Sequence, residues 1–252
     1  MNRKIFITGA SSGFGKAIAT TFAKNGDDCI ITGRRDDRLE ELCNELESKY
    51  NVAIYTLCFD VQDKDAVKKA IDGLPDDWKD IDVLVNNAGL ALGRDYFEEA
   101  DLADWETMID TNVKGLLYVS RAISAGMATR KKGHIINVGS TAAKEAYEKG
   151  NVYCASKSAV DAISKGMRID LLRHGIKVTA IHPGAAETEF SLVRFKGDAD
   201  TAKSVYQGFE PLQAEDVANV VYYCTTLPAH VCINDLVLTC TAQASSFYFL
   251  RK

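Results

Sequence analysis

The sequence predicts an α/β fold, with a parallel sheet of about seven strands and helices on both of its faces. Short apolar runs alternate with amphipathic helical stretches along most of the chain, as expected for a parallel sheet whose faces are both covered. The first apolar run, residues 4–7, leads directly into a glycine-rich turn and then a helical pattern. No repeat, low-complexity tract or linker interrupts the sequence, so residues 1–252 are expected to form one domain.

The remaining elements follow in a regular order. The other expected strands are apolar runs bounded by turn residues, at 29–32, 52–59, 81–85, 133–138, 177–181 and 233–239. Helical periodicity predicts helices over 16–24, 63–73, 105–130, about 152–173 and 214–225. Asp36 and Asp37, just after the second strand, resemble helix N-caps. Residues 187–213 break this rhythm after the carboxyl end of a strand, where such sheets bind ligands, and are expected to form a substrate lid.

Composition excludes several classes of protein. Hydrophobic residues are 46% and charged residues 26%, and the net charge of −5 gives no electrostatic reason to bind nucleic acid or an anionic membrane. No apolar run is long enough for a membrane span or a signal peptide, so we expect a cytoplasmic protein. The seven cysteines show no CxxC spacing, which favours reduced thiols. The four histidines share no obvious partner, and no metal site is expected; they are His134, His174, His182 and His230.

The glycine-rich turn directly after the first strand is typical of a dinucleotide-binding, Rossmann-type unit. Gly9, Gly13 and Gly15 permit a tight turn and close approach of the backbone to a pyrophosphate, which the following helix N-terminus favours electrostatically. Ser11 and Ser12 offer hydroxyl donors to the same phosphates. A doubly wound sheet that binds a dinucleotide is therefore predicted.

The end of the second strand indicates which dinucleotide binds. An acidic residue there holds the ribose 2′-hydroxyl of NAD, whereas arginine accommodates the 2′-phosphate of NADP. Arg34 and Arg35 follow Gly33 at this point, and NADP is therefore favoured. The alternative is that both arginines are only solvated loop residues.

Tyr153 and Lys157 are four residues apart in a helical stretch and so lie on one face of it. A free tyrosine, with a pKa of about 10, is a poor acid or base at neutral pH. A neighbouring ammonium lowers the pKa of a phenol, so Lys157 would make Tyr153 suitable for proton transfer. An isolated pair of this kind is more often a surface pair, and the rest of the sequence decides between the two interpretations.

The combination of motifs resembles the short-chain dehydrogenase/reductase family over essentially the whole chain. It comprises Thr8-Gly9-Ala10-Ser11-Ser12-Gly13-Phe14-Gly15, Asn86-Asn87-Ala88-Gly89, Asn112, Ser140, Tyr153, Lys157 and Pro183-Gly184. Ser140 lies thirteen residues before Tyr153, the usual spacing in that family. Stretches 88–93, 104–112, 188–198 and 227–231 further resemble its NADP-dependent 3-hydroxy acid dehydrogenase branch. Members of that branch oxidise serine, allo-threonine and 3-hydroxy acids or reduce malonic semialdehyde, and are typically tetramers, so a homotetramer is expected.

The resemblance implies a role for each matched residue. Tyr153 would be the acid/base, Ser140 would hydrogen-bond the substrate oxygen, and Lys157 would lower the tyrosine pKa and bind the nicotinamide ribose. Asn112 would support a water path to Lys157, although an amide that satisfies helix backbone groups is an equal alternative. The expected cofactor-binding residues are Gly9, Ser11, Ser12, Gly13, Phe14, Gly15, Arg34, Arg35, Asp60, Val61, Asn87, Gly89, Tyr153, Lys157, Pro183, Gly184 and Thr188.

The predicted function is hydride transfer between NADP(H) and a small 3-hydroxy acid, or the matching semialdehyde or oxo acid. Such a substrate needs a partner for its carboxylate, and Arg194 in the predicted lid is the first candidate, with Lys196 second. A solvated surface role for Arg194 stays open. The alternative functions are a 3-oxoacyl or general carbonyl reductase on the same fold, and a non-catalytic NADP-binding regulator.

Overall fold

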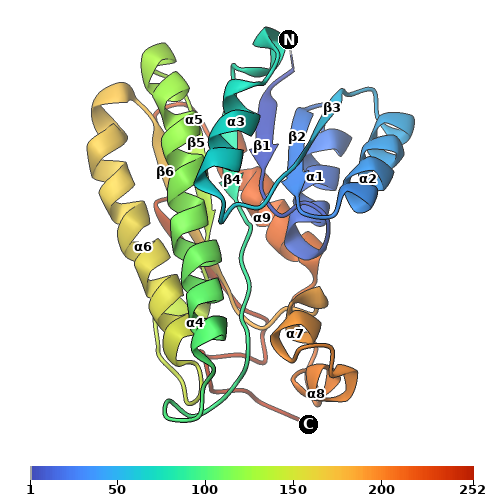
Figure 1. The fold of residues 1–252 in the computed structure, drawn as a ribbon, viewed down its shortest axis with the longest axis vertical. Helices are drawn as coiled ribbons and strands as arrows, with labels where there is room; N and C mark the ends of the chain where they lie inside the picture. The colour runs from blue at the N-terminus through green and yellow to red at the C-terminus, as the bar shows by residue number, and fades with distance from the viewer. Residues whose placement is uncertain (1) are drawn as a thin grey trace.

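The computed structural model describes residues 2–252, and residue 1 lies outside this range. Its centre is one sheet of seven strands in the order β3-β2-β1-β4-β5-β6-β7, and all neighbouring pairs are parallel (Figure 1). The strands are β1 (Lys4–Ile7), β2 (Asp28–Gly33), β3 (Ile54–Cys58), β4 (Val83–Asn86), β5 (His134–Val138), β6 (Lys177–Pro183) and β7 (Asp235–Leu238). The predicted fold class is confirmed. The strand order reverses between β1 and β4, which is where open parallel sheets bind their ligands.

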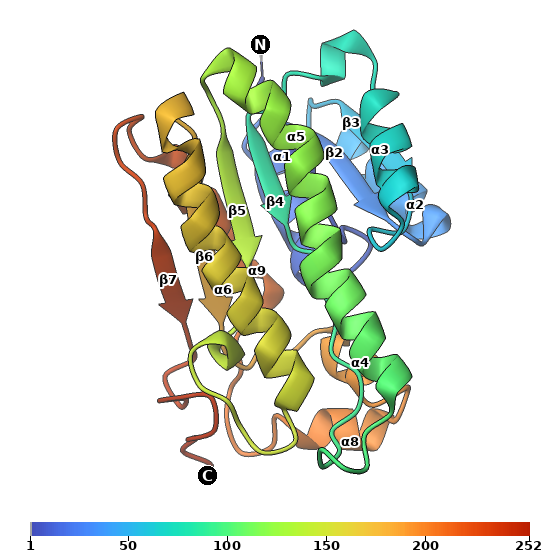
Figure 2. The ribbon, with the colours of Figure 1, turned by 60° about the vertical axis from the view of Figure 1, so that its left-hand side comes forward.

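Helices cover both faces of this sheet. They are α1 (Gly13–Lys24), α2 (Asp36–Lys49), α3 (Lys64–Asp72), α4 (Leu102–Ile109), α5 (Leu116–Arg130), α6 (Asn151–Leu171), α7 (Glu189–Arg194), α8 (Ala199–Ser204) and α9 (Ala214–Thr226). Helices α1, α2 and α9 pack on one face, and α3, α5 and α6 pack on the other. Figure 2 shows α5 and α6 crossing in front of β4, β5 and β6.

Strand β1 shows why the sequence folds in this way. Ile5 and Ile7 point into the apolar cluster beneath α1 and α9, whereas Phe6 between them points into the cluster beneath α3 and α5. Side chains alternate between the two faces of a strand, so a central strand with helices on both sides must be apolar at every position. All three side chains are completely buried.

Some element boundaries differ from those predicted. Asp36 and Asp37 are not N-caps of α2: Arg35 occupies the cap position, and both aspartates lie in the first helical turn. A carboxylate is stabilised there by the partial positive charge of the helix N-terminus, so the residue type was right and the position was wrong. The long helical stretch over 105–130 is interrupted by one π-helical segment, Asp110–Gly115.

The predicted lid, 187–213, contains the short helices α7 and α8 beyond the carboxyl ends of the strands (Figure 1). Its function as a lid stays a prediction. No helix among residues 2–252 is both long enough and apolar enough to cross a membrane.

Candidate active site

A cleft of about 1180 Å³ opens at the carboxyl ends of the strands and beneath α7 and α8. Of the residues predicted to bind cofactor or substrate or to act in catalysis, all but Gly15, Asn112 and the second carboxylate candidate Lys196 line this one cleft. Residues more than 180 positions apart in the chain therefore share a single cavity.

The glycine-rich turn forms the floor of the cleft next to β1. Gly9 has a φ of +67°, and a Cβ there would lie 2.9 Å from the Cα of Ala88. A Cβ on Gly15 would lie only 2.1 Å from the carbonyl oxygen of Gly9. Side chains at these two positions would push the turn apart, so the sequence keeps bare backbone where a pyrophosphate would approach.

Arg35 is held against the glycine-rich turn. Its guanidinium donates hydrogen bonds to Ser11 Oγ at 2.9 and 3.1 Å and to Ser12 Oγ at 2.8 Å. The same guanidinium pairs with Glu189 of α7 at 3.1 Å, and Arg38 pairs with that carboxylate at 2.8 Å. The two arginines lower the pKa of Glu189 against the opposing effect of its burial. The sequence analysis did not identify Arg38 or Glu189, although Arg38 lies in the first turn of α2, only three residues after Arg35.

Arg34 lies on the other side of the same rim. Its guanidinium is mostly exposed and pairs with Asp60 at 3.4 Å. Asp60 also accepts a backbone hydrogen bond from Gln62, which fixes the turn after β3. Val61 follows, and its side chain packs against Gly115. Arg34, Asp60 and Val61, which were predicted at the adenine and 2′-phosphate end of a cofactor, thus lie together at one end of the cleft, and their role stays a prediction.

Asn87 ties the end of β4 to the end of β1. Its side-chain amide donates to the carbonyl oxygens of Thr8 and Gly9 at 2.9 and 3.2 Å. In return the Thr8 hydroxyl accepts the backbone N–H groups of Asn87 and Ala88. These bonds close the gap between β1 and β4 at the switch point of the sheet, which is why Asn87 and Gly89 line the cleft.

Tyr153 lies in the first turn of α6 and Ser140 follows β5, so two separate elements bring their side chains together. Tyr153 is 8% exposed, and burial raises the pKa of its phenol well above the ordinary value. The Ser140 side chain acts in the opposite direction, because it lowers the pKa of Tyr153 through a hydrogen bond. The phenol is therefore fully protonated at neutral pH in the ligand-free chain.

Lys157 lies one turn further along α6 and is also buried. Burial lowers the pKa of its ammonium from 10.5 to about 8. The ammonium donates to the carbonyl oxygen of Val138 at 3.0 Å and has no carboxylate partner within 4 Å among residues 2–252. In the ligand-free chain burial is the largest influence on the pKa of Tyr153 and raises it, so the expected lowering by Lys157 stays a prediction.

Asn112 is part of the π-helical segment between α4 and α5. Its side chain accepts the backbone N–H of Leu90 at 2.9 Å and donates to the Leu90 carbonyl at 2.8 Å and to Ser156 Oγ at 3.0 Å. It therefore satisfies backbone groups of another segment, not those of its own helix. A Cβ on Gly89 would lie 3.2 Å from Asn112 Oδ1 and 3.4 Å from Lys157 Nζ, so both side chains approach this one glycine.

Arg194, at the end of α7, reaches back toward the tyrosine. Its guanidinium lies 5.6 Å from the ring centres of both Tyr147 and Tyr153 and donates to Tyr147 Oη at 3.0 Å. It has no carboxylate within 4 Å in the described part of the chain. Lys196, the second candidate, is paired with Asp104 at 2.8 Å. The structure therefore favours Arg194 over Lys196 as the candidate for binding a carboxylate. Of these two cations, only Arg194 lines the cleft and has no paired anion in the described part of the chain.

The last side of the cleft follows β6. Pro183 ends that strand, and Gly184 packs so closely on Gln243 that a Cβ would lie 2.1 Å from its side-chain oxygen. Thr188 caps α7 by accepting the Phe190 backbone N–H, and it lies against Gly13. Gly13 and Thr188, two predicted cofactor-binding residues that are far apart in the sequence, therefore lie next to each other at this side of the cleft.

Comparison with known proteins agrees with this geometry. The family model for short chain dehydrogenase matches residues 3–198. The NADP-dependent 3-hydroxy acid dehydrogenase YdfG of Salmonella typhi is 46% identical over 241 residues, which cover 95% of this chain and 96% of that relative. Sulfoacetaldehyde reductase 2 of Chromohalobacter salexigens is 46% identical over 253 aligned residues, which cover 100% of this chain and 100% of that relative. The closed form of serine dehydrogenase complexed with NADP+ superposes with a TM-score of 0.92 at 46% identity and covers 99% of both chains. The chain therefore belongs to the short-chain dehydrogenase family.

Proposed function

We propose that this protein is an NADP-dependent oxidoreductase that transfers a hydride between NADP(H) and a small 3-hydroxy acid or the corresponding semialdehyde or oxo acid. The observation that carries the substrate class is the position of Arg194. A half-buried guanidinium 5.6 Å from the Tyr153 ring, with no carboxylate within 4 Å among residues 2–252, is suited to bind an anionic group of a substrate held at that tyrosine. Serine, allo-threonine and 3-hydroxypropionate each carry such an anionic group, their carboxylate, in addition to the hydroxyl that would be oxidised.

The cofactor choice follows from the arginines at the far end of the cleft. Bare backbone at Gly9 and Gly15 leaves room for a pyrophosphate, and Arg34, Arg35 and Arg38 surround the place where a 2′-phosphate would lie. NADP+ is the ligand of the serine dehydrogenase that superposes on this chain, and NADP-dependence is named for the YdfG relative. When bound, the cofactor supplies or accepts the hydride.

The chain supplies the proton chemistry. Tyr153 exchanges a proton with the substrate oxygen, and the Ser140 hydroxyl holds that same oxygen and stabilises the charge that develops on it. Lys157 contributes a positive charge one turn from the phenol, and the buried contact of Asn112 with Leu90 keeps the segment beside Lys157 in place. These roles are proposed from position and from the chemistry of the side chains.

The test of the substrate class is the exchange of Arg194 for methionine and for lysine. Arg194→Met should raise KM for 3-hydroxypropionate about 10- to 100-fold, because a charged hydrogen bond contributes about 1.5–3 kcal/mol. The neutral analogue 3-hydroxypropionamide should be affected less than 3-fold, and Arg194→Lys should recover part of the loss. Equal effects on acid and amide would remove Arg194 from the substrate site. Initial rates with serine, allo-threonine, 3-hydroxypropionate and 3-hydroxyisobutyrate, each with NADP and NAD, would then identify the preferred substrate.

A second candidate is the reduction of an aldehyde that carries a sulfonate. A guanidinium binds a sulfonate as well as a carboxylate, and the Chromohalobacter relative that spans the entire chain is named a sulfoacetaldehyde reductase. Sulfoacetaldehyde should therefore be compared with malonic semialdehyde at equal concentrations. An acyl thioester belongs in the same panel, because a 3-oxoacyl reductase would prefer it and would not depend on Arg194.

We also propose a cytoplasmic homotetramer. Support comes from exposed apolar side chains on α5 and at the end of α6: Leu117 of α5, Ile169 of α6 and Leu172 just after α6 are 41%, 74% and 73% exposed in the single chain. Light scattering should give four times the 27.6 kDa chain mass.

A further inference from the structure

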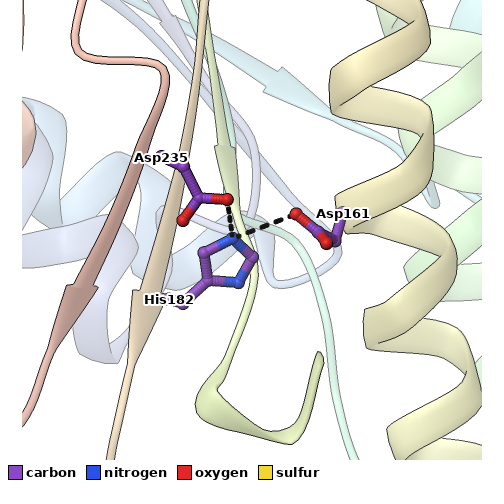
Figure 3. A group of neighbouring side chains, drawn as sticks. All are labelled: Asp161, His182 and Asp235. Carbon is purple, nitrogen blue, oxygen red and sulfur yellow. Dashed lines mark ion pairs between the residues drawn. The ribbon is translucent and has the colours of Figure 1, made fainter. Parts of the chain in front are cut away.

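Three acceptor atoms converge behind the catalytic serine. His182, at the end of β6, points its Nε2 at Asp161 of α6 and Asp235 of β7 (Figure 3), at distances of 3.5 Å from Asp161 Oδ1 and 3.6 Å from Asp235 Oδ2. The three ligand atoms all lie within 4.8 Å of one another. The sequence indicated no partner for His182, whereas the fold places two carboxylates beside it.

The hydrogen bond on the other side of the ring fixes where the imidazole proton lies. His182 Nδ1 is 3.2 Å from the backbone carbonyl oxygen of Ser140, and a carbonyl can only accept, so Nδ1 carries the hydrogen. With the hydrogen on Nδ1, the neutral imidazole presents Nε2 as a lone pair. Nε2 is completely buried and has no hydrogen-bond partner among residues 2–252.

Together these atoms form a possible ligand set for a cation: two carboxylate oxygens and one imidazole lone pair lie close to one another. No group among residues 2–252 donates a hydrogen bond to that lone pair. Zinc binds imidazole and carboxylate at about 2.0–2.2 Å, which in tetrahedral geometry separates neighbouring ligand atoms by about 3.3 Å. The separations of 3.5 and 3.6 Å are close to this value. A histidine that binds a metal usually donates its other N–H to a carboxylate or a backbone carbonyl, as His182 does to Ser140.

Lys144 now neutralises this cluster. Its ammonium lies 3.2 Å from Asp161 Oδ1 and 2.7 Å from Asp235 Oδ2, the same two oxygens that face His182. The other oxygen of Asp161 is held by Lys165 at 2.7 Å. The side chains of Lys144 and Asp235 are 31% and 35% exposed, so solvent reaches the cluster from that side and the lysine can leave it.

We propose that Asp161, His182 and Asp235 form a binding site for a divalent transition-metal ion of the zinc type, which enters in exchange for the ammonium of Lys144. The imidazole favours such an ion over magnesium or calcium, which prefer ligand sets made of oxygen alone. A bound ion would join α6, β6 and β7 directly behind Ser140. The proposal is independent of the substrate that the cleft accepts.

The test is a titration of the full chain with Co²⁺ after treatment with a chelator. Cobalt reports its ligands by absorption, and the seven free cysteines would give an intense thiolate charge-transfer band that this site cannot produce. We expect one Co²⁺ per chain without that band, and its displacement by Zn²⁺. Lys144→Met removes the competing ammonium and should tighten binding at least 10-fold.

Two matched variants remove ligand atoms and keep the shape. His182→Asn retains an N–H at the position of Nδ1 for the Ser140 carbonyl but lacks Nε2, and Asp235→Asn replaces one carboxylate oxygen by nitrogen. Each should weaken binding at least 10-fold without lowering the melting temperature of the metal-free chain by more than a few degrees. Lack of saturable binding to the wild-type chain, a thiolate spectrum, or unchanged affinity in both variants would overturn the proposal. So would unchanged affinity in Lys144→Met.

Discussion

The carboxylate of Glu189 pairs with two of the arginines that we propose to hold the 2′-phosphate of NADP. It lies 3.1 Å from Arg35 and 2.8 Å from Arg38, and Glu189 begins α7 in the predicted lid. On this proposal NADP would have to displace or share the carboxylate, whereas NAD, which lacks the 2′-phosphate, would not. Glu189→Gln removes the competing charge and should strengthen the binding of NADPH but not of NADH.

The size of this effect follows from the exposure of the groups. The Arg35, Arg38 and Glu189 side chains are 40–43% exposed, so each ion pair is worth about 0.2–1 kcal/mol after screening by solvent. Two pairs together give about 0.4–2 kcal/mol, or about 2- to 30-fold in Kd. The difference should shrink as salt is raised from low to physiological concentration.

Fluorescence titration with NADPH and NADH measures both dissociation constants directly. Glu187→Gln is the matched control, because it removes the same charge two residues earlier in an exposed side chain that pairs with no arginine among the described residues. The reasoning is refuted if Glu189→Gln weakens NADPH binding, changes both cofactors equally, or behaves like the control.

Two further predictions concern α6. Tyr153→Phe should reduce kcat by at least 100-fold and leave the Kd for NADPH within about 3-fold, because the phenol moves a proton and contributes little to holding the cofactor; near-normal turnover would contradict this. Lys157→Met should stabilise the cofactor-free chain at pH 7 by about 2 kcal/mol. Burial of the ammonium, which lowers its folded-state pKa from 10.5 to about 8, costs the wild-type chain about 3 kcal/mol of stability. The variant avoids this cost but loses about 1 kcal/mol with the hydrogen bond to Val138. The unfolded wild-type chain binds more protons than the folded chain between pH 8 and 10.5, so wild-type stability rises with pH in that window and the advantage of the variant disappears by about pH 10.5. Urea unfolding at pH 7 and pH 10 tests this, and a less stable variant at pH 7 would contradict it.

Much of the fold could be predicted because the signals are local. Residues 5–7 are all apolar because helices cover both faces of β1, and the glycines that follow are needed where backbones touch, as the 2.1 Å approach at Gly15 demonstrates. Such constraints leave a mark within a few consecutive residues, as an apolar run or a glycine that can be read directly.

Charge pairing across the fold leaves no such pattern. Glu189 is 154 residues from Arg35, and nothing in either local sequence indicates the pair. Burial is equally invisible in the local sequence: spacing places Lys157 one turn from Tyr153, but the largest influence on the pKa of each group is how deeply the surrounding helices bury it. Spacing along a helix predicts proximity, and only the packed structure determines desolvation.

The unusual energetics of the cleft have a common explanation. Lys157 is a buried ammonium without a carboxylate partner, Tyr153 is a phenol that burial keeps protonated, and Arg194 is a half-buried guanidinium without a paired anion in the described chain. The buried or half-buried charges of Lys157 and Arg194 reduce the stability of the ligand-free protein, and a fold selected for stability alone would pair or expose them. All three line one cleft, where an anionic substrate and a nicotinamide ribose would supply the missing partners. The same residues that cost stability in the free chain are therefore those that we expect to gain most when cofactor and substrate bind.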